Sequence, residues 1–292
     1  MKPAAFEYHA PATVEEAAAL LAELGDQAKL IAGGQSLVPM LALRLAVFDH
    51  LVDVSRTAGL RGVRRESGGA LWIGAGTTQA AIERSAEVAE AVPLLARATP
   101  LIGHFQIRNR GTLGGSIAHA DAAAEYPAVA VTLDAELEAV SAAGARTIPS
   151  AKFFLGQWTT ELGADEVLTG LRFPVWRGRT GFAVEEFARR HGDFAIAGAA
   201  IAVELDPDDR IRRCGIGLFG LGSKPERATA VEAELIGRHL ADVAADEVGR
   251  AAISGLGPCA ADLHGSAEYR ARVGAAVVAR GWQRALREAG DG

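Results

Sequence analysis

Two glycine pairs, each followed closely by a serine, constrain this chain of 292 residues more than any other sequence feature. The first pair lies in residues 33–36, and the second lies in residues 114–116. Glycine allows a backbone to take positive φ and to approach a ligand closely. Consecutive N–H groups in such turns can form an anion-binding concavity. The two turns together indicate a bound diphosphate, although ordinary loop glycines remain the alternative in a chain with 34 glycines.

The first glycine pair directly follows an apolar stretch, residues 29–32, which we expect to be a strand. A glycine turn at the carboxyl end of a strand is where α/β proteins commonly hold ligands. Upstream, Thr13 and Glu16 have the spacing of a capping box, which predicts a helix that ends at Gly25. Further elements expected in this unit, residues 1–55, are a short helix over 39–45 and a strand over 50–54.

The remainder of the chain divides into two further units. Between 56 and 175 we expect a strand over 70–76, a helix capped by Thr77 or Thr78, a helix over 92–102, a hairpin over 135–141 and 145–148, and a strand over 167–173. Glycine, charge and a preceding proline make residues 176–181 the best linker candidate. Beyond it we expect a hairpin over 198–205 and 211–218 and helices over 225–240, 245–256 and 267–289. The predicted fold class is α+β.

Composition and charge exclude several classes of protein. The formal charge is −6 with both signs interspersed, so no basic stripe favours nucleic acid. No run approaches the roughly 18 apolar residues that a membrane span needs. Cys214 and Cys259 stand alone, so we expect no zinc or iron–sulfur site in this chain. The first residues lack a hydrophobic signal region, and we expect a cytoplasmic protein.

Two further glycine motifs look like dinucleotide-binding fingerprints. Residues 215–220 match GxGxxG literally, but 221–225 intervene before any helix, whereas the third glycine of a true fingerprint lies in the helix. We interpret this stretch as a glycine-rich strand entering a loop. Residues 74–79 have better context but lack the third glycine and the acidic residue about 20 positions on.

No catalytic constellation is recognisable. The chain has no Gly-x-Ser-x-Gly elbow, and neither cysteine has an evident partner. His119 and Asp121 can be an acid–base pair or can line a ligand, and we favour the lining role. We expect no catalytic residue and no metal ligand in this chain. The chemistry is then supplied by a bound cofactor, which the protein positions.

Three stretches together resemble the signatures of a known family. They are residues 32–39, residues 106–121 and residues 189–195. They are similar in order and spacing to those of the FAD-binding medium subunit of molybdenum hydroxylases, the group of aerobic carbon monoxide dehydrogenase and xanthine dehydrogenase. The resemblance covers essentially the whole chain. It implies a two-subdomain FAD-binding fold of the vanillyl-alcohol oxidase (PCMH) type over residues 1–175, with subdomains of about 1–55 and 56–175, and a small α+β domain over 176–292.

The resemblance also implies which residues bind FAD. Residues 32–37 would wrap the pyrophosphate, residues 112–116 would complete the cradle, and Glu125 would meet cofactor hydroxyls. Leu168 and Ile102 would be apolar walls near a ring. The full implied set is Ala32, Gly33, Gly34, Gln35, Ser36, Leu37, Ile102, Thr112, Gly114, Gly115, Ser116, His119, Asp121, Glu125, Leu168 and Phe194.

Two positions depart from the relatives. Phe194 stands where carbon monoxide dehydrogenase subunits typically have tyrosine, and Ile196 stands where some xanthine dehydrogenases have lysine. These changes leave open what Phe194 does at the flavin and whether this chain interacts with NAD. For Arg108 and Arg110 we favour surface or interface positions over phosphate contact.

The expected function follows from the family. Electrons would pass from [2Fe–2S] clusters of a small partner subunit to FAD in this chain, and then to an external acceptor. Substrate would be hydroxylated at a molybdenum cofactor on a large partner subunit, in a heterotrimer that itself dimerises. The alternatives are a self-sufficient flavin oxidase or reductase of the same fold, and a non-catalytic assembly subunit. The motifs do not specify the substrate or the acceptor.

Overall fold

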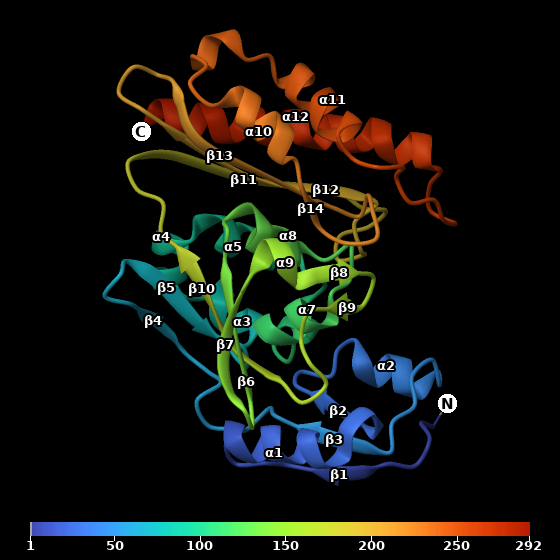
Figure 1. Ribbon diagram of the computed structural model, residues 1–292. Helices are drawn as coiled ribbons and strands as arrows, with labels where there is room; N and C mark the ends of the chain where they lie inside the picture. Colours follow the sequence, from blue (N-terminus) through green and yellow to red (C-terminus); the bar gives the residue numbers. More distant parts are fainter. Residues whose placement is uncertain (1) are drawn as a thin grey trace.

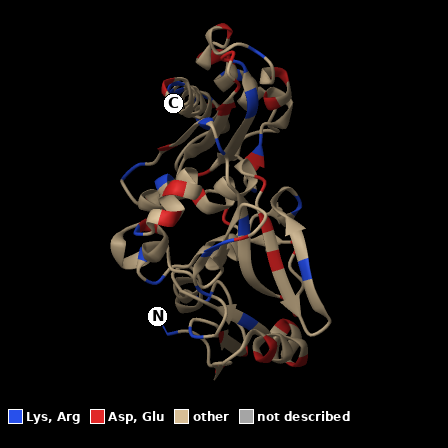
Figure 2. Ribbon diagram, turned by 90° about the vertical axis from the view of Figure 1, so that its left-hand side faces the viewer, with Lys and Arg blue, Asp and Glu red and all other residues tan. Residues whose placement is uncertain are grey.

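The computed structural model describes residues 2–292 and has three units stacked along one axis (Figure 1). The N-terminal unit lies at one end, a middle unit follows, and the C-terminal sheet with its helices lies at the other end. Lys and Arg are interspersed with Asp and Glu over the ribbons of all three units (Figure 2). Within residues 2–292, no helix is both long and apolar enough to cross a membrane.

The N-terminal unit is a three-stranded parallel sheet with strand order β1-β3-β2. Its elements are β1 (Glu7–His9), α1 (Val14–Leu24), η1 (Gly25–Gln27), β2 (Ala28–Ile31), α2 (Leu37–Ala42) and β3 (His50–Asp53). The predicted cap is confirmed, because the Thr13 hydroxyl accepts from the Glu16 N–H at 3.2 Å. The helix expected over 39–45 is α2, which begins and ends earlier, and the sequence did not predict β1.

The middle unit contains a five-stranded antiparallel sheet with order β4-β5-β10-β6-β7. Its strands are β4 (Val63–Arg65), β5 (Ala70–Gly74), β6 (Glu136–Ser141), β7 (Gly144–Pro149) and β10 (Val167–Pro174), with a small pair β8 (Phe154–Gly156) and β9 (Thr159–Thr160). The predicted hairpin and the strand over 167–173 are confirmed.

Short helices cover this sheet. They are α3 (Gln79–Glu83), α4 (Ala86–Ala91), α5 (Pro93–Ala98), η2 (Thr99–Leu101), α6 (Phe105–Arg108), α7 (Leu113–His119), α8 (Glu125–Thr132) and α9 (Ser150–Phe153). Thr78, one of the two expected caps, accepts from the Ala81 N–H at the start of α3. The prediction of one helix over 92–102 is wrong: α5 ends at Ala98 and a 3-10 turn containing Pro100 follows, because proline interrupts helical hydrogen bonding.

The C-terminal unit is a four-stranded antiparallel sheet under a layer of helices (Figure 1). Its elements are β11 (Arg179–Phe187), β12 (Ala197–Leu205), β13 (Ile211–Phe219), β14 (Glu226–Arg227), α10 (Thr229–Leu235), η3 (Leu240–Asp242), α11 (Ala245–Ser254) and α12 (Ala267–Asp291). The hairpin and the last helix are confirmed. The linker over 176–181 is wrong in part because β11 starts at Arg179, and the helix over 225–240 reduces to α10.

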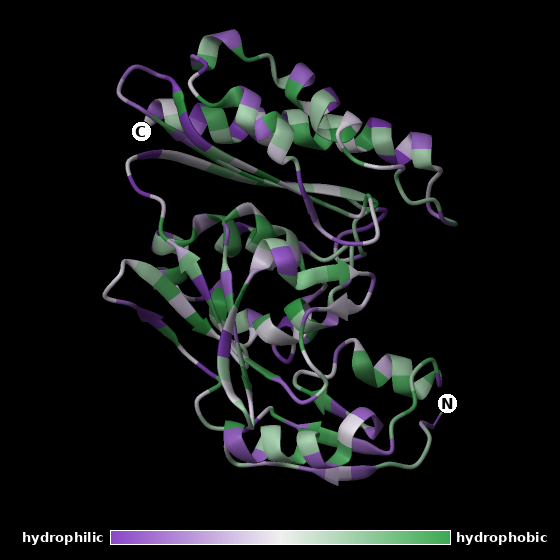
Figure 3. Cartoon of the chain, viewed as in Figure 1, coloured by the Kyte–Doolittle hydropathy of each residue, from purple (hydrophilic) through white to green (hydrophobic). Residues whose placement is uncertain are grey.

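The middle and C-terminal units meet through α8, and all eight residues of this helix are buried. Hydrophobic residues predominate where the two units meet (Figure 3). A Cβ on Gly215 would lie 2.4 Å from the Thr132 carbonyl oxygen, and one on Gly217 would lie 2.0 Å from the Thr132 hydroxyl. These glycines therefore let β13 lie directly against the helix. The interpretation of 215–220 as a strand, rather than a dinucleotide fingerprint, is confirmed.

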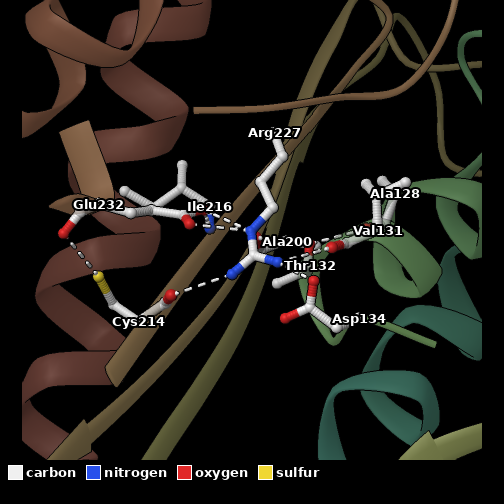
Figure 4. Close-up of polar contacts among 9 residues, drawn as sticks. All are labelled: Ala128, Val131, Thr132, Asp134, Ala200, Cys214, Ile216, Arg227 and Glu232. Carbon is white, nitrogen blue, oxygen red and sulfur yellow. Dashed lines mark hydrogen bonds and ion pairs between the residues drawn. The ribbon is translucent and has the colours of Figure 1, made fainter. Parts of the chain in front are cut away.

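A half-buried arginine lies in the same contact (Figure 4). Arg227 donates to both carboxylate oxygens of Glu232 at 2.9 Å, to the Asp134 carboxylate, and to the carbonyls of Val131 and Cys214. A charged side chain is tolerated at such a place only when its donors are paired. We call this contact between α8 and β12, β13 and β14 the closed joint.

Candidate functional site

The first glycine turn leaves a row of backbone donors free. Residues 33–37 run from just after β2 to the first residue of α2, and Gly34 has a φ of +71°. Within residues 2–292, no acceptor is paired with the N–H of any of these five residues, while the Gln35 side chain donates back to the Gly33 carbonyl at 2.9 Å. Successive unpaired N–H groups in a turn with a left-handed residue form a concavity that attracts anions. We call residues 33–37 the amide turn.

The second glycine stretch is a helix start and not a loop. Thr112 caps α7, and its hydroxyl accepts from the Gly115 N–H at 3.0 Å. The Gly114 N–H donates to the Ala75 carbonyl at 2.8 Å, and the Ser116 N–H donates to the Thr112 carbonyl. The backbone donors of residues 113–116 are therefore used inside the protein. What remains for a ligand from this stretch is the Ser116 hydroxyl.

The two glycine stretches are in direct contact. A Cβ on Gly33 would lie 2.2 Å from the Arg110 carbonyl oxygen and 2.8 Å from the Gly111 Cα. A Cβ on Gly115 would point across the gap to the Ala32 side chain, at 3.8 Å. The absence of a side chain at Gly33 therefore permits approach of protein backbone, which fixes the amide turn against the start of α7. We call this the open joint.

The two arginines of the second motif make protein contacts. Arg108 pairs with Glu83 at 2.9 Å, and it also donates to the carbonyls of Ile102 and Gly103. Its side chain is 11% exposed, so Arg108 is not a solvated surface group. Its hydrogen bonds stabilise the turn at 102–103 from inside the protein. Arg110 is exposed and forms no ion pair within the described residues 2–292.

Beyond α7, a buried carboxyl group of the middle unit interacts electrostatically with a half-buried carboxyl group of the C-terminal unit. Glu125 is the first residue of α8, and its burial raises its pKa to about 8, with the Glu186 carboxylate as the next cause. Burial also raises the pKa of Glu186, on β11, to about 7, and its Oε2 atom is buried without a partner. Sequence reasoning missed Glu186, because nothing in a strand residue with charged neighbours marks it as inward-facing.

His119 and Asp121 do not form a pair. The Asp121 carboxylate accepts from the Ala123 N–H at 2.9 Å, and the His119 ring stacks at 6.4 Å on Trp158. Burial lowers the pKa of His119. No hydrogen bond joins His119 to Asp121 within residues 2–292, so this geometry supports a lining role over an acid–base pair.

A second cluster lies where the C-terminal unit touches the turn at 102–104. A Cβ on Gly192 would lie 3.0 Å from the His104 ring and 3.1 Å from Gly103. Phe194, in the same loop, is 63% exposed, Ile102 is half-buried, and Leu168 is buried in the middle core. The cavity here, of about 380 Å³, is lined by His104, Phe105, Gln106, Arg108 and His191.

One buried arginine of α12 holds the end of this loop. Arg270 donates to the Ile196 carbonyl at 2.6 Å and to the Gly220 carbonyl at 2.7 Å, and it pairs with Asp262 at 2.6 Å. Arg270 is 5% exposed. No hydrogen bond within residues 2–292 joins this cluster to the amide turn. We therefore describe the predicted site residues as two groups, one around the amide turn and the start of α7 and one around this cluster.

Comparison with known proteins identifies the family. Residues 4–176 match the FAD-binding domain of molybdopterin dehydrogenases, and residues 182–285 match the C-terminal domain of carbon monoxide dehydrogenase flavoproteins. The chain therefore belongs to the family of FAD-binding medium subunits of molybdenum-containing dehydrogenases, and the resemblance found in the sequence is confirmed.

Individual relatives cover nearly the whole chain. It is 43% identical to the 6-hydroxypseudooxynicotine dehydrogenase complex subunit alpha of Paenarthrobacter nicotinovorans, over 99% of this chain and 97% of that protein. It is 39% identical to the carbon monoxide dehydrogenase medium chain of Hydrogenophaga pseudoflava, over 96% of each. A solved structure of that dehydrogenase matches with a TM-score of 0.93 over 99% of both chains, and quinoline 2-oxidoreductase of Pseudomonas putida matches with 0.91, again over 99% of each, at 34% identity.

Proposed function

We propose that this chain binds FAD with its pyrophosphate on the amide turn, and that it carries electrons within a molybdenum hydroxylase complex. The single observation that carries the proposal is the row of five free N–H groups at residues 33–37, held by contact between Gly33 and the Arg110 carbonyl. A diphosphate needs several donors and no nearby acid, and this turn contains no carboxylate.

The proposed division of labour among the other site residues follows their surroundings. Ala32 and Gly115 leave the gap between the two glycine stretches free of side-chain bulk, and the Ser116 hydroxyl has no protein partner within residues 2–292. Glu125, protonated at neutral pH, can donate as well as accept a hydrogen bond, which suits a cofactor hydroxyl. Ile102, Leu168 and Phe194 supply apolar surface for a ring.

Bound FAD supplies reversible two-electron and one-electron chemistry, and the chain supplies position and electrostatics. The proposed electron source is a small iron–sulfur subunit, beside a large subunit that carries the molybdenum cofactor. The proposed assembly is a dimer of heterotrimers, and the electrons leave to an external acceptor. The proposed location of the complex is the cytoplasm.

The absorption spectrum of the purified chain tests the cofactor. We expect the yellow spectrum of oxidised flavin at one FAD per chain, either as purified or after incubation with FAD. A chain that stays colourless after that incubation contradicts FAD binding and supports the assembly-subunit alternative.

Co-purification tests the partners separately. A tagged chain expressed from its native host should recover an iron–sulfur protein and a molybdenum protein in equal amounts. Recovery of a yellow, catalytically competent protein without either partner would instead support a self-sufficient flavin oxidase or reductase.

A further inference from the structure

Three side chains that bind metals converge on the sheet of the N-terminal unit. Glu7 and His9 lie on β1, and His50 lies on the adjacent β3, where it is the register partner of Glu7. The distance from His9 Nε2 to His50 Nδ1 is 3.2 Å, and that from His50 Nδ1 to Glu7 Oε2 is 3.4 Å. The three ligand atoms all lie within 4.8 Å of one another. Glu7 and His9 are two positions apart on a strand, so they share one face with His50.

Hydrogen bonding alone does not satisfy this arrangement well. His50 Nδ1 is the shared atom of both close contacts, and it carries at most one proton. If it donates, one N–H must serve the carboxylate and the His9 nitrogen together at long distances. If it accepts from His9, its lone pair faces the Glu7 carboxylate without a proton between them. A cation among the three atoms accepts a lone pair from each of them.

The spacing also suits a particular class of cation. Zinc binds imidazole nitrogen and carboxylate oxygen at about 2.0–2.1 Å, so two ligands of a tetrahedral zinc ion lie about 3.3 Å apart. The two separations in the structure, 3.2 and 3.4 Å, lie on either side of that value. Two neutral imidazoles and one carboxylate also form the ligand set that first-row divalent ions prefer over Mg²⁺ or Ca²⁺.

The two imidazoles are less exposed to solvent than the carboxylate. The His50 side chain is 17% exposed, His9 is half-buried, and the Glu7 side chain is 75% exposed. The two imidazoles are therefore held by the sheet, and the carboxylate can swing onto an incoming ion from solvent. An open side also leaves room for a water molecule as the fourth ligand.

We propose that His9 Nε2, His50 Nδ1 and a Glu7 carboxylate oxygen form a binding site for a divalent first-row transition metal, with zinc as the expected ion. The site joins β1, an edge strand of three residues, to the central strand β3. It acts as a structural clip, with no part in the flavin chemistry. It is independent of the proposed FAD site, which lies at the other end of β2.

Zinc binding to the intact FAD-loaded chain tests the site. The protein is stripped with a chelator, mixed with zinc chloride, passed through gel filtration and analysed for metal. We expect one zinc per chain in the wild type and in His264→Asn, which removes an exposed imidazole elsewhere. His9→Asn and His50→Asn should bind zinc at least roughly tenfold more weakly, since even lost support of a ligand costs that much.

A milder variant keeps the test valid if a histidine variant folds poorly. Glu7→Gln alters a mostly exposed side chain, and it should weaken zinc binding while leaving the circular dichroism and the FAD content unchanged. Zinc should raise the unfolding temperature of the wild type but not that of the histidine variants, because ligand binding stabilises only a folded site. Absence of zinc in the wild type overturns the proposal. Equal zinc affinity in His9→Asn, as expected if Cys259 captured the metal, overturns it as well.

Discussion

The closed joint and the open joint, where the middle unit contacts its two neighbours, differ in whether their polar groups are paired within the protein. In the closed joint, Arg227 pairs with Glu232 and Asp134 and with two carbonyls, and Thr132 donates to Ala128. In the open joint, five consecutive N–H groups have no acceptor within residues 2–292. Buried polar groups that pair internally stabilise one structure, whereas donors left free at a rigid turn are available to a ligand. This difference fits the proposal that the N-terminal contact binds the cofactor, whereas the C-terminal contact stabilises the fold.

The largest expected effect is that of Gly217→Val in the closed joint. The new Cβ would lie 2.0 Å from the Thr132 hydroxyl and 2.7 Å from the Ala128 carbonyl oxygen, and helix backbone cannot move aside cheaply. We expect a loss of about 3 kcal/mol in the free energy of unfolding. Urea unfolding measures it, with Gly68→Val, which has open space around its Cβ, as the control. A wild-type unfolding midpoint would contradict the description of this joint.

Gly115→Val should break the open joint without unfolding the chain. Its side chain would fill the gap towards Ala32 and push against the Thr112 hydroxyl, 2.8 Å away. We expect FAD binding to weaken about a hundredfold, which corresponds to about 2.7 kcal/mol. Flavin content after gel filtration measures this, and Gly156→Val, again with open space, should retain FAD. Full FAD occupancy in Gly115→Val would remove residues 112–116 from the proposed site.

Arg227→Ala tests the polar part of the closed joint. The change leaves Glu232 and Asp134 without their cation and two carbonyls with fewer donors, so we expect a loss of about 2 kcal/mol in stability. Arg212→Ala removes an arginine whose side chain is 72% exposed, and it should cost less than about 1 kcal/mol. Thermal unfolding of both variants makes the comparison. Equal effects would mean that the network contributes no more than a surface ion pair.

The smallest effect is a pH dependence at the carboxyl pair. Because the pKa of Glu125 rises from 4.5 to about 8 on folding, its contribution to stability is complete below pH 4.5 and is lost as the pH rises through 8. Glu186 and Asp121 face it, and both raise its pKa further. Relative to Glu125→Gln, the FAD-free wild type should lose about 2 kcal/mol between about pH 5.5 and pH 7, at about 1.4 kcal/mol per pH unit. Parallel curves of stability against pH for the wild type and Glu125→Gln would contradict the raised pKa of Glu125.

Sequence patterns predicted the elements that show one periodicity over a sufficient length. The 25-residue helix α12 and the hairpin of β12 and β13 are examples. Helix α8 was missed because all eight of its residues are buried, so it has no polar face and no amphipathic period. Pro127 also predicts an interruption of a helix, although the first turn of a helix, where Pro127 lies, tolerates proline. Strand β1 was too short to produce a pattern.

The site was predicted only where contacts are local in sequence. The amide turn follows from a strand and a glycine pair, and the family resemblance supplied its partner stretch. The contact of Gly33 with the Arg110 carbonyl and the approach of Glu186 to Glu125 depend on how the units pack. No sequence spacing encodes either one. The convergence of His9 and His50 is likewise set by strand pairing over 41 positions.

The strand order of the middle sheet has a consequence for synthesis of the chain. Strand β10 lies between β5 and β6, although it follows them by many residues. A nascent chain therefore carries both glycine stretches and Glu125 before the strand that joins the two halves of the middle sheet has left the ribosome. Domains generally complete folding as units during translation. FAD capture should thus begin only after residue 174 emerges, and chains released earlier should be recovered without flavin.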